Sequence, residues 1–291
     1  CNKEVVLSAG VIASPRILLA SGIGNAVELA ALNIDCKKDL KGVGENLQDH
    51  IDSMVTVRSE NAPSIGVSLR TLIPHIIPAP LKYWFKRKGW WTTNYVEVGG
   101  FAKTKFAEAN NDEPDIQFHF ATLSADMAGA KPHSFPGFTF SVCQLRPSSR
   151  GHVRIKSADP LQAPAMLANY LTTEHDRQCA INAIRFARKL SQTAALSDYV
   201  AQEIKPGLAM ESDQEILTFA RQTGATIFHP TGTCKMGNDP LAVVDQRLRV
   251  HGVGGLRVVD CSIMPNLVSG NTSAPAAMIA EKASDMILAD A

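Results

Sequence analysis

The chain begins and ends with the same pattern, a short apolar strand followed by a helix, and this pattern frames a strand-rich middle. Residues 4–7 form an apolar, β-branched run, and Ser14 followed by Pro15 is typical of a helix start, with the helix expected to end at Gly22. Residues 256–260 form a second such run, and a helix is predicted over 276–288. The two ends therefore predict pieces of an α/β domain.

The middle of the chain reads as a mostly antiparallel sheet. Strands are predicted at 51–58, 96–102, 115–122, 139–145 and 152–156, with proline-rich connections between them. One long insertion, 65–93, holds all three tryptophans, Trp84, Trp90 and Trp91. A 3.6-residue period predicts a helix over 172–191, and Ser212 with Glu215 forms a capping box that begins another. The predicted class is α+β, an antiparallel sheet flanked by helices, joined to part of an α/β domain.

Composition excludes several classes of protein. The 291 residues carry a formal net charge of +1, which argues against a broad basic face for nucleic acid. No apolar run approaches the roughly 20 residues of a membrane-spanning helix. The six cysteines have irregular spacings and predict neither a zinc site nor a disulfide framework, so we expect no metal, and free thiols in a reducing compartment. The first residue is Cys1 rather than Met, and a strand follows at once with no leader, which favours the C-terminal part of a longer protein.

Two polar loops near the C-terminus carry residues suited to chemistry. His229 lies in a turn rich in Gly and Thr, and Asn271 lies in a polar loop that opens the final helix. A histidine titrates near neutral pH, and backbone N–H groups at a helix start attract anions or polarised carbonyls. The two loops are compatible with one shared pocket, but a single histidine near a turn is more often a structural residue, so the pattern alone gives only a weak signal for an enzyme.

Several separate blocks resemble the glucose–methanol–choline oxidoreductases, a family of flavoprotein alcohol oxidases and dehydrogenases. The C-terminal blocks are 229–237 (HPTGTCKMG), 244–245, 249–252, 256–260, 262–265 and 270–272. The N-terminal blocks are 10–24, which departs from the family pattern at Val11, and 42–50 (GVGENLQDH). Because these blocks occur in the family's order and flank the whole chain, the resemblance covers both ends of it.

One family feature is missing from this sequence. The family opens with a strand and a G-x-G-x-x-G turn that holds the FAD pyrophosphate, and no such turn occurs here. The resemblance therefore implies three segments: 1–50 as the distal part of the FAD-binding domain, 51–225 as the substrate-binding domain, and 226–291 as a C-terminal return to the FAD-binding domain with active-site loops. The N-terminal half of the same protein is the implied partner.

The resemblance also implies a role for each site residue. In the family a base takes the hydroxyl proton of the alcohol while the carbon gives a hydride to flavin N5, and the base matches His229. Asn271 matches the second catalytic position and would donate a hydrogen bond to the developing alkoxide. The residues expected to contact FAD are Asp260, Cys261, Asn271, Thr272 and Pro275. For Asp260, a purely structural role as a strand-end cap is equally compatible.

Assignments in the middle of the chain stay open. Glu97 and His119 lie on predicted strands and are candidates to line the substrate cavity, Glu97 against a cationic head group as in choline-oxidising relatives. For His119, packing in the core is the alternative. The three tryptophans favour core or lid packing over a cation cage. His50, Asp49 and Asn46 are expected to fix a loop at the domain junction rather than to take part in chemistry.

The function implied is FAD-dependent oxidation of a primary alcohol to an aldehyde. Choline dehydrogenase is the nearest alternative, and a truncated chain that is inactive without its N-terminal half is another. A quinone, a cytochrome or oxygen would reoxidise the flavin. The expected location is the cytoplasm, with peripheral association with the inner membrane if the acceptor is a quinone.

Overall fold

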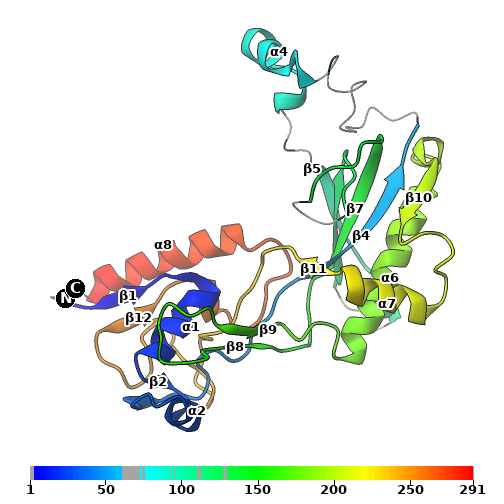
Figure 1. Ribbon diagram of the computed structural model, residues 1–291. Coiled ribbons are helices and arrows are strands. Elements are labelled where there is room, and N and C mark those ends of the chain that lie inside the picture. The colour runs from blue at the N-terminus through cyan, green and yellow to red at the C-terminus, as the bar shows by residue number, and fades with distance from the viewer. Residues whose placement is uncertain are drawn as a thin grey trace. The chain divides into compact units, whose positions relative to one another are not determined.

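The chain forms two compact units. The computed structural model describes residues 3–60, 73, 76–92, 94, 96–109, 113–126 and 130–290 (Figure 1). Unit 1 comprises Cys1–His50, Arg146–Thr173 and Phe228–Ala291, and unit 2 comprises Ile51–Leu145 and Glu174–Ile227. The sequence predicts a continuous middle segment over 51–225, whereas residues 146–173 pack within unit 1 in the structure.

Unit 2 is built on an antiparallel sheet, as the sequence predicts. Strands β4 (Ile51–Arg58), β5 (Val96–Ala102), β6 (Ile116–Ala121), β7 (Gly137–Gln144) and β10 (Gln202–Lys205) are ordered β10-β4-β7-β6-β5, and β11 (Ala225–Thr226) also pairs with β4. Every pairing is antiparallel. Apolar residues on one face of the central strands are buried, including Val55, Val57, Phe140 and Val142.

Two helices of unit 2 pack against the central strands. Helix α6 (Glu174–Ser191) contacts β4, β6 and β7, and α7 (Asp213–Thr223) contacts α6 and β4 (Figure 1). The capping box predicted at Ser212 is confirmed, because Ser212 accepts from the backbone of Glu215 while the Glu215 side chain accepts from Ser212. The shorter elements of unit 2 are α4 (Ala79–Lys86), η2 (Trp90–Thr92), α5 (Lys105–Ala109) and η3 (Ser197–Tyr199).

The predicted insertion over 65–93 is only partly described. Residues 65–72, 74, 75 and 93 lie outside the described residues. The described part contains α4 and η2, which contact each other through Tyr83 and Trp91, whose ring centroids lie 6.2 Å apart. The sequence favours core or lid packing of the tryptophans, and the exposure of Trp84 and Trp91 contradicts a core position for these two.

Unit 1 has short strands and a core made largely of loop residues. Strand β1 (Val5–Leu7) pairs in parallel with β12 (Leu256–Val258), and β2 (Ile23–Gly24) pairs in parallel with β3 (Lys38–Asp39). Parallel pairs linked through helices are what an α/β domain uses. Helices α1 (Gly10–Ala20), α2 (Ala26–Ala31), η4 (Cys261–Ile263) and α8 (Ser273–Asp290) complete the unit. One apolar cluster joins its segments, with Leu18, Leu29, Val244, Val258 and Ile279 buried in it.

Helix α1 begins earlier than the sequence predicts. Its first residue is Gly10, so Pro15 lies inside the helix and Ser14 is not the N-cap. The carboxylate of Asp260 accepts from the backbone N–H of Gly10 at 3.0 Å and from the Ser14 hydroxyl at 2.5 Å, which supports the extra turn. Pro15 has no N–H for the carbonyl of Val11, and the hydroxyl of Thr233 donates to that carbonyl instead, at 2.6 Å.

The strand predicted over 152–156 does not join the large sheet. It forms β8 (His152–Arg154), which pairs with β9 (Ala165–Leu167) in a separate two-stranded sheet of unit 1. The backbone N–H of Val153 donates to the carbonyl of Gly44 at 2.7 Å. The local pattern therefore gave the strand correctly, but its partner lies in a segment that periodicity does not identify.

Candidate active site

His229 is a buried side chain of unit 1, held by a backbone contact. The backbone N–H of His229 donates to Oδ1 of Asp49 at 3.1 Å, and the Tyr170 hydroxyl donates to Oδ2 of the same carboxylate. The preceding residue, Phe228, has φ 66° and is exposed. A bulky residue with positive φ is strained, and such strain is concentrated at functional sites. The loop at His229 is therefore held by tertiary contacts in a conformation that its own sequence disfavours.

The second histidine of the site is His50. Nδ1 of His50 lies 3.0 Å from Nδ1 of His229, and the two rings meet edge to face with their centroids 5.2 Å apart. His50 is fully buried. One hydrogen lies between the two Nδ1 atoms when both rings are neutral, because two N–H groups cannot donate to each other. The pair therefore couples the proton position on one ring to that on the other.

Asn271 lies on the opposite side of the His229 ring. Its side-chain amide nitrogen is 3.4 Å from Nε2 of His229. Two proton arrangements are self-consistent. In one, Nδ1–H of His229 donates to His50 and the lone pair on Nε2 faces the amide. In the other, His50 donates to Nδ1 of His229, and Nε2–H faces the amide oxygen after a flip. The structure thus brings both predicted catalytic residues together.

The loop that carries His50 is fixed to the loop that carries His229. Gln48 and Thr231 exchange two backbone hydrogen bonds, at 3.1 and 2.8 Å. Gly232 has φ 96°, and a Cβ there would lie 2.4 Å from the carbonyl oxygen of Asn46, so only glycine allows this approach. The sequence predicts that Asn46, Asp49 and His50 fix a loop. The contact of His50 with His229 is not predicted by the sequence, although His50 ends the block 42–50 that resembles the family.

Asp260 is engaged within unit 1. Its Oδ2 accepts from Gly10 and Ser14, and its Oδ1 accepts from the backbone N–H of Ser262 at 2.7 Å, as the N-cap of η4. Of the two roles the sequence left open, these contacts favour the cap. Cys261 is half-buried and Thr272 is buried, while Asn271 is exposed and leads into α8. The first turn of α8 carries no acidic residue.

The two substrate-lining candidates lie on strands of unit 2. Glu97 is in β5, and its side chain lies outside the described part of the structure. His119 is in β6, half-buried, and aligned across the sheet with Gly99 of β5 and Ser141 of β7. The structure does not bring either residue together with His229, because the placement of one unit against the other is not determined.

A buried carboxylate in β4 was missed by the sequence reasoning. Asp52 is buried, and its Oδ2 accepts from the Ser141 hydroxyl at 2.8 Å. Burial raises the pKa of the Asp52 carboxyl to about 7, although the hydrogen bond from Ser141 lowers it. No local sequence pattern marks Asp52 as unusual. The free-energy cost of burying a carboxylate becomes apparent only when both faces of the strand are known to be buried.

Other chemistry is not indicated in the described residues. Cys36, Cys143, Cys179, Cys234 and Cys261 are free thiols, and Cys1 lies outside the described residues. Burial raises the pKa of the thiols of Cys179, Cys234 and Cys261, so these stay protonated. No cluster of three or more potential metal ligands occurs within the described ranges. None of the described helices combines the length and apolar composition that a bilayer crossing needs.

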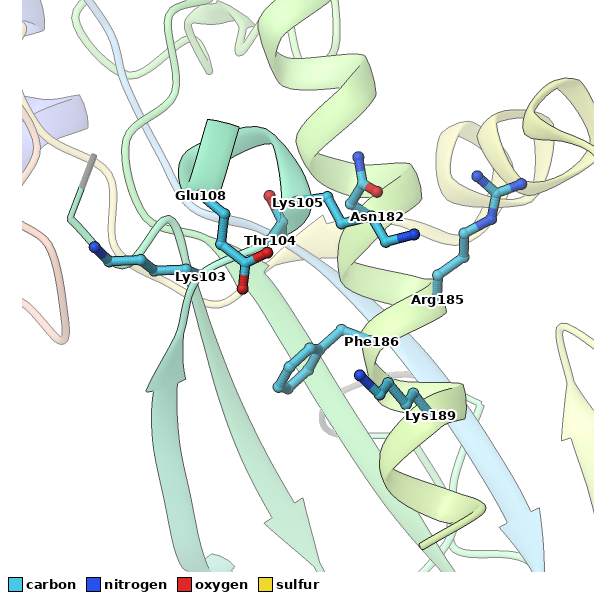
Figure 2. Close-up of a pocket in the computed structure, with 8 residues that line it drawn as sticks. All are labelled: Lys103, Thr104, Lys105, Glu108, Asn182, Arg185, Phe186 and Lys189. Atoms are coloured by element: carbon cyan, nitrogen blue, oxygen red, sulfur yellow. The ribbon is translucent and has the colours of Figure 1, made fainter. Parts of the chain in front are cut away.

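Unit 2 also contains an open cavity of about 350 Å³ that holds none of the predicted site residues. Figure 2 shows its lining, which comes from the segment around α5 and from α6. Lys103, Lys105, Arg185 and Lys189 surround Phe186. Arg185 is already paired with Asp213 at 2.6 Å, so part of this positive charge is neutralised within the protein.

The fold and the histidine–asparagine site define a class of protein, and comparisons with known proteins identify it. Family models described as GMC oxidoreductase match residues 1–52 and 147–280. The chain belongs to the GMC oxidoreductase family. It is 42% identical over 287 residues to "Alcohol dehydrogenase [acceptor]" of Pseudomonas putida, and the aligned region covers 99% of this chain and 51% of the relative. It is 44% identical over 286 residues to "Oxygen-dependent choline dehydrogenase" of Escherichia coli O45:K1, which covers 98% of this chain and 50% of the relative.

Solved structures give the same result. The formate oxidase of Aspergillus oryzae RIB40, a protein with an FAD modification, matches with a TM-score of 0.89 at 28% identity, over 100% of this chain and 55% of that chain. Pyridoxine 4-oxidase from Mesorbium loti matches with a TM-score of 0.78 at 28% identity, over 97% of this chain and 50% of that chain. The chain thus spans about half the length of the relatives it matches.

Proposed function

We propose that the chain carries the proton-transfer residues of an FAD-dependent dehydrogenase or oxidase that converts a primary alcohol to an aldehyde. The observation that carries the proposal is the position of His229 between His50 and Asn271, at 3.0 and 3.4 Å. In the overall reaction the hydroxyl proton goes to His229, the C–H bond of the carbinol carbon breaks, and its electron pair leaves as hydride. Bound FAD would supply the two-electron acceptor for that hydride.

The residues at the start of α8 fit a flavin. The first N–H groups of a helix have no partner within the helix, and they attract phosphate or carbonyl oxygen. The first turn of α8 has no acidic residue to compete for these groups. Asn271, Thr272 and Pro275 would hold the cofactor at this helix end, with the backbone of Cys261 beside them. Asp260 would act indirectly, by fixing η4 through its contacts with Gly10, Ser14 and Ser262.

His229 is proposed to act as the base through Nε2. That role requires the arrangement in which Nδ1–H of His229 donates to His50, because only then does Nε2 carry a lone pair instead of a hydrogen. When Nε2 accepts the alcohol proton, the imidazolium keeps its hydrogen bond to His50. The buried, neutral His50 would thus orient the base and stabilise its charged form, and Asp49 would hold the loop backbone.

Asn271 is proposed to hold the alcohol oxygen. Its amide N–H groups cannot take the proton, and they can donate to an oxygen that gains negative charge as the proton leaves. With Asn271 in place, His229 is the titratable member of the pair. Glu97 and His119 are proposed to line the substrate cavity, which relies on the family resemblance. The electron acceptor would be a quinone, a cytochrome or oxygen. The enzyme would be cytoplasmic, with peripheral association with the inner membrane if the acceptor is a quinone.

Choline oxidation is the second candidate, because relatives named for choline and for alcohol are similarly identical to the chain, at 44% and 42%. A third possibility is that the chain is inactive without the other half of such an enzyme.

The test is a flavin titration followed by a substrate comparison. The purified chain is mixed with FAD, free ligand is removed, and the visible absorbance is recorded. Retained flavin and reduction by a medium-chain primary alcohol, faster than by choline, would support the proposal. Faster reduction by choline would favour the second candidate. A colourless chain would favour the third, and a flavin-loaded enzyme that neither alcohol reduces would refute the proposed reaction.

A further inference from the structure

Helix α4 carries an apolar stripe that is exposed in the described structure. Leu81, Trp84 and Phe85 of α4, with Ile77 two residues before the helix begins, follow the i, i+4, i+7, i+8 spacing of one helical face. Each of them is between 61% and 77% exposed. On a helix of a globular domain such a stripe normally faces the core, so an exposed one indicates a partner.

The segment around this stripe is uniformly basic. Residues 76–92 include Lys82, Lys86, Arg87 and Lys88 and no Asp or Glu. The guanidinium of Arg87 lies over the Tyr83 ring at 5.0 Å, and Arg87 ends the helix in the left-handed conformation. Trp91 of η2, which packs beside Tyr83, is also exposed. Helix, turn and η2 thus form one local structure that presents aromatic and cationic side chains together.

We propose that this segment, residues 76–92, docks the protein on an anionic lipid bilayer. Apolar and tryptophan side chains on one side of a helix, with lysine and arginine beside them, are what an interfacial helix needs. Four cations in a segment that contains no Asp or Glu complement the negative surface of a bilayer that contains acidic phospholipid. An acidic protein surface would also complement the charge of this segment. It would not account for the exposed apolar face, on which Trp84 and Phe85 are the largest side chains.

The inference builds on the proposed location of the enzyme at a membrane, and it does not depend on the proposed chemistry. Alcohol turnover is measured in solution with a soluble acceptor, and vesicle binding is measured without substrate, so each fails separately. The cavity of Figure 2 is the strongest rival, because it also gathers lysines in unit 2. Control variants therefore have to separate the two basic surfaces.

The experiment mixes the full chain with vesicles of phosphatidylcholine and phosphatidylglycerol at 7:3, or of phosphatidylcholine alone. All three tryptophans, Trp84, Trp90 and Trp91, lie in the segment, so tryptophan emission reports on it alone. The expected result is co-sedimentation with the anionic vesicles, a blue shift of the emission, and quenching by brominated acyl chains. Binding should weaken as salt is added.

Two variants test the two parts of the surface while keeping the tryptophans. Lys82→Glu/Lys86→Glu should weaken partitioning on the order of 30-fold. Leu81→Gln/Phe85→Gln should weaken it at least roughly tenfold. The matched controls are Lys105→Glu/Lys189→Glu at the cavity and Leu161→Gln on another exposed surface, and both should bind as the unmodified chain does.

Three results would overturn the proposal. The first is no vesicle response from the unmodified chain. The second is loss of binding in the cavity variant with retention in the α4 variants. The third is a stable dimer in sedimentation velocity that Leu81→Gln/Phe85→Gln dissociates, without vesicle binding, because a second copy would then cover the stripe.

Discussion

The two units differ in how much regular structure supports them. Unit 1 has strands of two or three residues, and many residues of its apolar cluster lie in loops. Unit 2 is built on strands of up to eight residues in one antiparallel sheet. The histidine pair and Asn271 lie in unit 1, on loops. A rigid scaffold that positions loops is the common arrangement for catalytic residues.

The difference predicts that substitutions should separate activity from stability. In unit 1, loss of a site side chain should affect turnover far more than folding. In unit 2, loss of a buried pair should affect folding. The largest effect is expected at His229, in the site of unit 1.

His229→Ala should lower kcat of the FAD-loaded enzyme by roughly 10²- to 10⁴-fold, because the general base is removed. The melting temperature should change little, since the backbone contact with Asp49 remains. The measurement is steady-state alcohol oxidation with a soluble acceptor. The matched control is His251→Ala, another histidine of unit 1, which bonds to the carbonyl of Gly237 and not to the site. Wild-type turnover in His229→Ala would remove His229 from the mechanism.

Local signals predicted the regular elements of both units well. Strands at 51–58 and 96–102 and the Ser212 cap are confirmed, because alternation and capping are properties of adjacent residues. The predicted start of α1 was wrong because the carboxylate of Asp260, 250 residues along the chain from Gly10, supports an earlier first turn, and no local signal reports that contact. Strand 152–156 was placed in the wrong sheet for the same reason.

The site shows a similar limit. The family resemblance supplied His229 and Asn271, whose proximity no periodicity argument provides. It did not supply the contact of His50 with His229, because a histidine at the end of a polar loop reads as a structural residue until its partner is in place. The role of Glu97 and His119 stays a prediction.

Arg188→Leu should destabilise unit 2 by about 3–5 kcal/mol, because it leaves a buried carboxylate unpaired. Arg188 holds Glu203 through Nε and Nη2, with distances of 2.9 to 3.2 Å, and both side chains are nearly buried. Chemical denaturation measures the loss. Replacing both residues by Leu should recover most of it. Arg177→Leu, which breaks the exposed pair with Glu174 on the same helix, should cost less than about 1 kcal/mol.

Asn271→Ala should lower kcat roughly 10²- to 10³-fold, less than the largest loss expected for His229→Ala, because one donor to the developing alkoxide is lost while the base stays. Asn271 is exposed, so the free energy of unfolding should hardly change. The measurement is the same turnover assay, together with FAD titration. If FAD affinity falls and kcat does not, Asn271 serves the cofactor rather than the alcohol.

Asp52→Asn should stabilise the protein at alkaline pH, against the usual direction for a buried substitution. The raised pKa, about 7 against 3.8 in the unfolded chain, means that the folded state holds a proton that the unfolded state releases. The stability from this carboxyl is complete below pH 4 and is lost as the pH rises toward 7. About three pH units at roughly 1.4 kcal/mol each set an upper bound of about 4 kcal/mol. Unfolding free energies of both proteins at pH 5 and pH 8 test it, and a difference that does not grow with pH would contradict it.

Ser212→Ala should cost about 1 kcal/mol, the smallest effect predicted here, because α7 loses its N-cap. Ser212 Oγ accepts from Glu215 N at 3.3 Å, and Glu215 accepts in return from the backbone of Ser212. Ser212→Gly should cost only a few tenths of a kcal/mol, since Gly leaves the backbone free to take the cap conformation. A loss as large as that of Arg188→Leu would mean that α7 holds unit 2 together through its first turn, and that local capping rather than the sheet limits the stability of this unit.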